Sequence, residues 1–344
     1  MFDKSELDEF DKQEMYKIYD KWPEIAREFY QKNIECVNYQ NIDHIAFAGM
    51  GGSGTIGDVF SSILSKENIH VSVIKGYLLP KTVDANTLVV ITSVSGNTIE
   101  TLTILESAIK NNIKTISFAS GGKIEEFCKK NGLKFFKIPK FHSPRASLIP
   151  FLYAILNILN SLLPIKKSEV LESILQLEQT RENISFQNLT KNNIALSLAE
   201  WINDIPVIYY PFGLQSAAIR FKNSLQENAK IHVFAEDIIE TSHNGIVSYE
   251  KKSIVKPILI EGVDDYVKTK QRWGVVKDFF NENQIEYKEI LSVEGGILSK
   301  LINLIYLLDY ASIYLAIFRK IDPTPVKSID FIKKKMDEKN NILE

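Results

Sequence analysis

Glycines gather at one point of the chain, in the segment Gly49-Met-Gly-Gly-Ser-Gly54. The segment follows a short apolar run and opens a stretch with helical spacing of apolar residues. Glycines in this position let backbone N–H groups crowd around an anion at the positive end of a helix. The segment therefore predicts an anion site, to which we assign Gly51, Gly52 and Ser53.

The same glycines match the G-x-G-x-x-G pattern of dinucleotide-binding proteins. That fold requires an acidic residue about 20 positions further on, near the end of the second strand. No acidic residue occurs between Glu67 and Asp84, and the lysine of a nucleoside-triphosphate P-loop is missing after the last glycine. These absences argue against the binding of a nucleotide, and we expect no cofactor.

A second loop, Thr92-Ser-Val-Ser-Gly-Asn-Thr98, offers the hydroxyl groups of Ser93, Ser95 and Thr98. One such loop is often only a capped helix start. Two loops that follow strands of one parallel sheet indicate a crevice at its carboxyl edge. Hydroxyl and amide donors without Mg²⁺ ligands suit a phosphate monoester, and no Cys/His cluster has the spacing of a zinc site. We therefore expect a phosphate site without a metal.

The elements that must position these loops alternate between short apolar runs and helical patterns. Strands are predicted at 44–48, 70–74, 87–92, 113–118 and 133–138, with helices at 55–64, 98–109 and 123–130. In the second half, strands are predicted at 206–210, 254–260 and 285–291, helices at 216–226, 268–282 and 296–319, and an irregular segment from 231. This alternation is typical of parallel βαβ units and predicts an α/β protein with two doubly wound sheets.

The length of 344 residues suits two domains. We expect an N-terminal helical segment (1–40), a first domain (41–165), a polar helical connector (166–198) and a second domain (199–344), which ends in a short basic helix at 329–336.

The charge balance and the cysteines exclude several protein classes. The chain has 41 basic and 43 acidic residues, which argues against a nucleic-acid binder. Its two cysteines form no C-x-x-C pair, and the acidic N-terminus lacks the apolar core of a signal peptide. We expect a cytoplasmic protein. Residues 147–165 carry no formal charge and 301–317 carry only Asp309, but polar breaks and the α/β context favour buried helices at domain or subunit interfaces over a membrane span.

The two loops resemble those of SIS (sugar isomerase) domains, in the forms GMGGSG and S-x-S-G-N-T-x-E-T. Four later features are similar to the two-domain bifunctional phosphoglucose/phosphomannose isomerases: Ser143-Pro-Arg-Ala-Ser-Leu148, Glu227-Asn-Ala-Lys-Ile-His232, His243-Asn244, and a tail of the type Asp-Pro…Ile-Asp-x-x-Lys. The resemblance covers roughly residues 41–336. It implies two SIS-type (flavodoxin-like) parallel-sheet domains that interconvert glucose 6-phosphate and fructose 6-phosphate, with mannose 6-phosphate as a second substrate.

Aldose–ketose isomerisation requires ring opening, a base that moves a proton between C1 and C2, and positive charge that stabilises the enediolate. By resemblance, Glu227 matches the catalytic base and Arg145 matches the arginine that stabilises the enediolate. Taken alone, a glutamate at a helix end and an arginine before an apolar helix would each be ordinary surface features.

The resemblance assigns ring opening to His243 and Lys333. It also implies that the histidine reaches the site from the neighbouring subunit, so that the active unit would be a homodimer. Lys334 and Lys327 stay open as alternatives to Lys333, because the register of the tail rests on few residues.

One departure concerns the second substrate. Some members of the family carry a threonine seven residues before the lysine, associated with mannose phosphate, where this chain has Val326. Two other functions also stay open: a non-catalytic phosphosugar-binding regulator, and an SIS isomerase for another sugar phosphate. The pathway, whether upper glycolysis and gluconeogenesis or sugar-nucleotide supply, is open as well.

Overall fold

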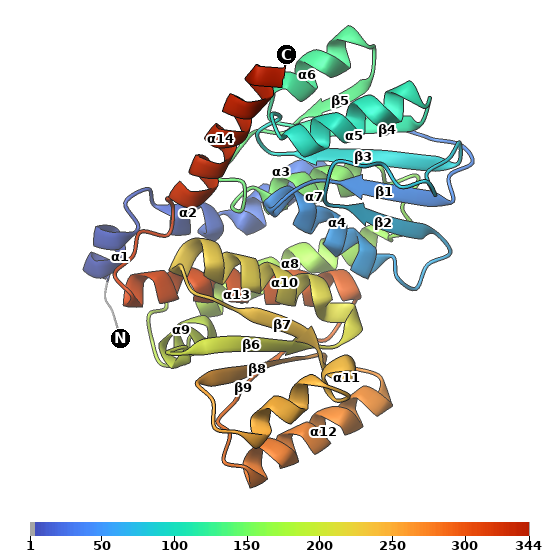
Figure 1. Ribbon diagram of the computed structural model, residues 1–344. Coiled ribbons are helices and arrows are strands. Elements are labelled where there is room, and N and C mark those ends of the chain that lie inside the picture. Colours follow the sequence, from blue (N-terminus) through green and yellow to red (C-terminus); the bar gives the residue numbers. More distant parts are fainter. Residues whose placement is uncertain (1–3, 344) are drawn as a thin grey trace.

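The computed structural model describes residues 4–343, so the ends of the expected N-terminal segment and tail, residues 1–3 and 344, lie outside the described residues. Figure 1 shows two sheets separated by layers of helices, with further helices on both outer faces. Both sheets are entirely parallel. The predicted α/β class with two doubly wound sheets is therefore confirmed.

The first sheet has the strand order β2-β1-β3-β4-β5. Its strands are β1 (His44–Ala48), β2 (His70–Ile74), β3 (Thr87–Ser93), β4 (Lys114–Ala119) and β5 (Lys134–Lys137). Alternate residues of β1 enter different cores: Ile45 and Phe47 face α4 (Gly52–Ile63) and the centre of the molecule, whereas Ala46 and Ala48 face α5 (Ile99–Lys110) and α6 (Gly122–Lys130). The strand is buried on both faces, which explains its unbroken apolar sequence.

The second sheet has the strand order β7-β6-β8-β9. Its strands are β6 (Ile205–Tyr210), β7 (Phe234–Asp237), β8 (Val255–Glu261) and β9 (Lys288–Leu291). Helices α10 (Gln215–Ser224) and α13 (Ile297–Phe318) cover its inner face, and α11 (Ile238–Thr241) and α12 (Val267–Glu282) pack on the other.

Strand β7 was predicted as irregular chain, and that prediction was wrong. Its sequence Phe-Ala-Glu-Asp has no apolar run, because β7 lies at the edge of the sheet and is half-exposed. Pro257, which weakened the prediction of β8, pairs with Val207 on one side only, since pairing with β9 begins at Ile258. A proline without an N–H is tolerated where a strand has no neighbour on that side.

The apolar helices lie between the two sheets. A single buried cluster contains residues of α3 (Trp22–Gln31), α4, α7 (Leu148–Ile158), α8 (Lys167–Ile184), α9 (Ile194–Trp201), α10 and α13, together with the inner faces of both sheets. In length and hydropathy α13 could cross a membrane, but 94% of its most apolar window is buried inside the protein. The charged N-terminal helices α1 (Lys4–Phe10) and α2 (Met15–Asp20) bury Leu7, Tyr16 and Tyr19 in the same cluster.

One buried histidine couples the first sheet to pH. His44 is 5% exposed; its Nδ1 lies 3.1 Å from Thr87 Oγ1 and its Nε2 lies 2.8 Å from Ser72 Oγ. Burial, aided by the neighbouring His70, lowers the pKa of His44 from its ordinary value of 6.5. The folded chain therefore binds fewer protons at this site than the unfolded chain does under mildly acidic conditions.

We predict that the free energy of unfolding falls as the pH drops below about 6.5, because protons bind preferentially to the unfolded state. The His44→Gln variant should show a shallower fall, measured by urea denaturation between pH 7.5 and pH 5. Identical slopes for the wild-type protein and the His44→Gln variant would contradict this assignment.

Candidate active site

The first predicted loop joins β1 to α4 through Gly51, whose φ of 53° lies in the left-handed region. At Gly49 a Cβ atom would lie 2.5 Å from Thr92 Oγ1 and 2.9 Å from the carbonyl oxygen of Ser53. Only glycine fits at this point, because the loop presses directly against the end of β3. The Val94 N–H then donates to Ser53 Oγ at 3.1 Å, which ties the first loop to the second.

The second loop folds around its own hydroxyl groups. Ser93 is buried; its Oγ accepts from the Gly96 N–H at 3.1 Å and lies 3.0 Å from Thr98 Oγ1. Ser95 is exposed and accepts from the Asn97 N–H at 3.2 Å. The loop thus directs Ser95 outward and holds Ser93 inside. Both loops lie at the carboxyl edge of neighbouring strands, as the sequence predicts.

Arg145 lies next to the first loop, in the turn before α7. A Cβ atom on Gly52 would lie 3.0 Å from the Pro144 carbonyl oxygen and 3.3 Å from Arg145 Cα, so this turn rests on the first residues of α4. The guanidinium is 4% exposed. It donates from Nη1 to Glu227 Oε2 at 3.0 Å and from Nε to Asn228 Oδ1 at 2.7 Å.

The same guanidinium also reaches the tail of the chain. Arg145 Nη2 donates to the carbonyl oxygens of Pro323 and Thr324, at 2.7 and 3.0 Å. One side chain of the first half therefore contacts both the segment that follows α10 and the segment that follows α13.

Glu227 lies in a π-helical turn, Leu225–Ala229, which continues α10 and ends at Lys230 in the left-handed conformation (φ 56°). Single π-turns within helices occur frequently at functional sites. The Lys230 ammonium donates to the Glu227 carbonyl oxygen and, at 3.4 Å, to that of Pro323. Burial, together with the nearby Arg145 charge, lowers the pKa of Lys230.

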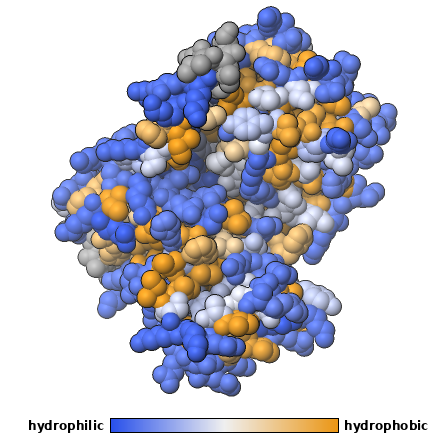
Figure 2. Space-filling view, viewed as in Figure 1, coloured by the Kyte–Doolittle hydropathy of each residue, from blue (hydrophilic) through white to orange (hydrophobic). Residues whose placement is uncertain are grey.

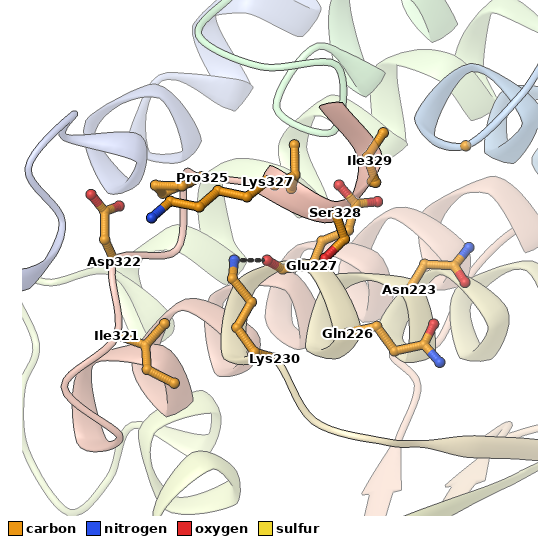
Figure 3. A pocket seen from close by; sticks show the side chains of 12 residues that line it. Asn223, Gln226, Glu227, Lys230, Ile321, Asp322, Pro325, Lys327, Ser328 and Ile329 are labelled. Atoms are coloured by element: carbon orange, nitrogen blue, oxygen red, sulfur yellow. Dashed lines mark hydrogen bonds between the residues drawn. The ribbon is translucent and has the colours of Figure 1, made fainter. Parts of the chain in front are cut away.

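A pocket of about 800 Å³ opens beside Glu227. Figure 2 shows this hollow between the two halves of the protein. Its lining comes from the first loop, the end of α10 with the π-turn that continues it, and the tail: Gly51, Asn223, Gln226, Glu227, Lys230, Ile321, Asp322, Pro325, Val326, Lys327, Ser328 and Ile329. Figure 3 shows Lys327 extending toward Asp322 across this pocket. The pocket therefore joins the glycine loop to a carboxylate, with two lysines close by.

Gly51 and Glu227 are the predicted site residues that line this pocket, whereas eight others lie outside its lining: Gly52, Ser53, Ser93, Ser95, Thr98, Arg145, His243 and Lys333. His243 is exposed in the turn after α11, where its N–H donates to the Glu240 carbonyl oxygen. Lys333 is exposed on the C-terminal helix α14 (Lys327–Leu343), whereas Lys327 at the start of that helix lines the pocket. A single chain thus brings together Gly51, Arg145 and Glu227 but adds neither His243 nor Lys333 to the pocket wall.

The sequence reasoning missed Lys230, Asn228 and Asp322 as residues of the site. The first two lie in the same Gln226-Glu-Asn-Ala-Lys230 segment as Glu227, so the segment itself was the available signal. Asp322 accepts from the Thr324 N–H at 2.9 Å and shapes the turn before Val326. Within residues 4–343, no group of three His, Cys, Asp or Glu side chains could hold a metal ion.

Two protein-family models match the chain. The SIS domain model covers residues 38–133, and the model of the bacterial phospho-glucose isomerase C-terminal SIS domain covers residues 191–336. Solved structures with the same fold include the C-terminal domain of glucosamine-fructose-6-phosphate aminotransferase from Francisella tularensis, with a TM-score of 0.64 and 16% identity over 89% of this chain and 96% of that one. At this identity the likeness shows the fold alone.

Relatives with curated names are closer in sequence. The bifunctional phosphoglucose/phosphomannose isomerase of Caldicellulosiruptor bescii is 32% identical over 94% of this chain and 99% of its own length. The protein of the same name from Thermoplasma acidophilum is 30% identical over 85% and 89%. A D-glucosamine-6-phosphate 4-epimerase of Sulfolobus acidocaldarius is 28% identical over 69% and 74%. With two SIS domains and this identity over nearly its whole length, the chain belongs to the bifunctional phosphoglucose/phosphomannose isomerase family of enzymes.

Proposed function

We propose that the chain interconverts glucose 6-phosphate and fructose 6-phosphate, and mannose 6-phosphate and fructose 6-phosphate, in one pocket. The observation that carries the proposal is the shared lining of Gly51 and Glu227, with the Arg145 guanidinium 3.0 Å from the Glu227 carboxylate. The glycine loop would bind the phosphate, and the carboxylate would meet the other end of the sugar. The names of the relatives support the same substrates.

In this mechanism Glu227 removes the proton from C2 of the open-chain aldose and returns it to C1, while the proton of the C2 hydroxyl passes to the C1 oxygen. The negative charge that develops on the enediolate oxygens needs a fixed positive group. Arg145 suits this role because its bonds to Asn228, Pro323 and Thr324 hold it in place before substrate binds. No metal takes part in these steps as proposed.

Substrate phosphate would be bound by the backbone N–H groups of Gly51, Gly52 and Ser53 and by the hydroxyl groups of the second loop. Ser95 and Thr98 suit direct contact, since Ser95 is exposed and Thr98 is half-buried at the start of α5. Ser93 supports the loop from within through its bonds to Gly96 and Thr98.

Ring opening is proposed for His243 from a second subunit and for Lys333, in line with the resemblance. Three large apolar side chains near His243 in the sequence, Phe234, Ile239 and Val247, are 55%, 38% and 56% exposed. Exposed apolar surface of this kind favours contact with a partner protein, and a second copy of this chain would also supply the missing imidazole. Both cysteines are free thiols, which fits the proposed cytoplasmic location.

Mannose 6-phosphate is the less supported of the two aldoses. Val326 lines the pocket and offers no hydroxyl group where the resemblance associates a threonine with mannose phosphate. The names of the relatives favour both substrates, so a panel of both aldose phosphates is part of the first assay.

Purified protein in EDTA should convert glucose 6-phosphate into fructose 6-phosphate, and the Glu227→Gln variant should lose about 10²–10⁴-fold in kcat, because it lacks the base. Glu67→Gln, which alters a glutamate in the turn after α4, is the matched control and should retain full activity. Turnover of the Glu227→Gln variant at the wild-type rate would remove Glu227 as the base. Binding of sugar phosphates by the wild-type protein without turnover would favour the regulator alternative.

The Lys333→Met variant should lose about 100-fold or more in kcat for the cyclic substrate, because the ring-opening acid is gone. Its neighbour Lys334→Met should be close to wild type. Lys327→Met decides between the two positions, since Lys327 lines the pocket. An inactive Lys327→Met variant beside an active Lys333→Met variant would transfer the role to Lys327.

Mixing two inactive variants tests the shared site. If His243 serves the neighbouring subunit, a mixed dimer of His243→Ala and Glu227→Gln chains contains one complete site. Co-refolded equal amounts should regain about a quarter of the wild-type activity, because half of the dimers are mixed and each has one active site of two. Failure to regain activity, with mixed dimers demonstrated by mass spectrometry, would contradict the exchange of His243.

A further inference from the structure

We infer that the buried ion pair Arg220–Asp309 is a positioning device for Arg145, acting across the boundary between the two halves of the chain. The inference rests on the proposed function, in which Arg145 stabilises the enediolate. Arg220 and Asp309 touch none of the reacting atoms themselves. They fix the backbone from which the Arg145 side chain projects.

Arg220 on α10 and Asp309 on α13 are almost completely enclosed, at 2% and 0% exposure. Arg220 donates from Nε and Nη2 to Asp309 Oδ2, at 3.0 and 2.6 Å. The other carboxylate oxygen, Oδ1, accepts from the Ser224 hydroxyl group at 2.7 Å. Both oxygens of Asp309 are therefore in use, and the orientation of the Arg220 guanidinium is fixed.

The fixed guanidinium has a second acceptor. Arg220 Nη2 also donates to the main-chain carbonyl oxygen of Arg145 at 2.7 Å. Beside it, Trp22 Nε1 donates to the carbonyl oxygen of Ala146 at 3.1 Å, and the Trp22 ring lies 5.9 Å from Arg220 Cζ. Two consecutive carbonyl groups of the turn that bears Arg145 are thus held by side chains from distant parts of the sequence.

The same turn of α13 also supports the Arg145 side chain. Ser312, three residues after Asp309, accepts from Asn228 Nδ2 at 2.8 Å, and Asn228 Oδ1 accepts from Arg145 Nε at 2.7 Å. The Ser312 hydroxyl group donates to the Asp309 carbonyl oxygen at 2.6 Å. One segment of α13 therefore fixes Arg145 twice: its main chain through Arg220, and its guanidinium through Asn228.

Stability alone is a weak reason for this arrangement. A buried ion pair pays a large desolvation cost, and well-packed apolar residues often serve stability equally well. Apolar side chains could not donate to the Arg145 carbonyl group. A lysine carries its donors on a single nitrogen, so it matches these acceptors less well than arginine, which spreads its donors over the planar fork of Nε and Nη2. The geometry thus points to the placement of Arg145 as the role of the pair.

The test compares two ligands that differ in charge at the reacting end. A five-carbon aldonate phosphate places a carboxylate where the enediolate charge develops, and a six-carbon polyol phosphate is neutral there. Titration calorimetry should show that Arg220→Lys lowers the affinity for the aldonate phosphate about tenfold or more, as expected for one impaired bond to a charged group. The affinity for the polyol phosphate should change by less than about twofold. Arg181→Lys, which alters the ion pair with Glu24, is the matched control and should change neither affinity.

A double variant separates positioning from a structural role. If Arg220 acts through Arg145, Arg145→Lys/Arg220→Lys should bind the aldonate phosphate no more weakly than Arg145→Lys alone. Additive losses, or equal weakening of both ligands, would overturn the inference. If Arg220→Lys does not fold, Ser224→Ala, which removes the hydroxyl donor to Asp309 Oδ1, serves as the milder variant, with the same selective weakening expected and the same outcomes against it. These measurements need no turnover, so an inactive wild-type enzyme would remove the proposed function, whereas unselective or additive losses would remove this inference.

Discussion

The structure depends on the satisfaction of one buried cation, the guanidinium of Arg145. A buried charge is tolerated only when its polar atoms have partners. Here those partners come from two remote segments: the π-turn supplies Glu227 and Asn228, and the tail supplies two carbonyl groups. The turn before α7, the end of α10 and the chain after α13 must therefore meet at one point. That meeting point forms one wall of the pocket.

The sequence predicts most of the fold because the signals are local. Runs such as Thr-Leu-Val-Val-Ile-Thr at 87–92 are buried on both faces, so apolar character alone marks them as strands. The two loops at the carboxyl edge are equally visible, since glycine and hydroxyl residues follow strand ends directly. Strand β7 shows the limit: Phe-Ala-Glu-Asp becomes a strand only because β6 offers a free edge, and nothing within the four residues indicates it.

The assembly of the site is much less visible in the sequence. Arg145 and Glu227 are 82 positions apart, and their contact results from the packing of α4, α7, α10 and α13. Helices α7 and α13 are apolar on most sides, and a helix that is apolar all round gives no sign of which neighbour it will have. Family resemblance selected Arg145 and Glu227, and the segment that contains Glu227 could also have indicated Lys230, whereas Asp322 emerges only from the tertiary structure. The roles assigned to Arg145, Glu227, His243 and Lys333 all stay predictions; of the four, Glu227 lines the pocket of one chain.

The single cluster of apolar residues that reaches from one sheet to the other has a consequence for how the protein can be divided. Each half repeats the βα architecture of a free-standing domain, yet the inner face of each sheet is completed by helices that also pack against the other half. A cut between the halves would expose the side of α4 on one piece and the sides of α10 and α13 on the other, and water-exposed apolar surface promotes aggregation. The two SIS domains are thus separable as units of sequence but share one apolar core.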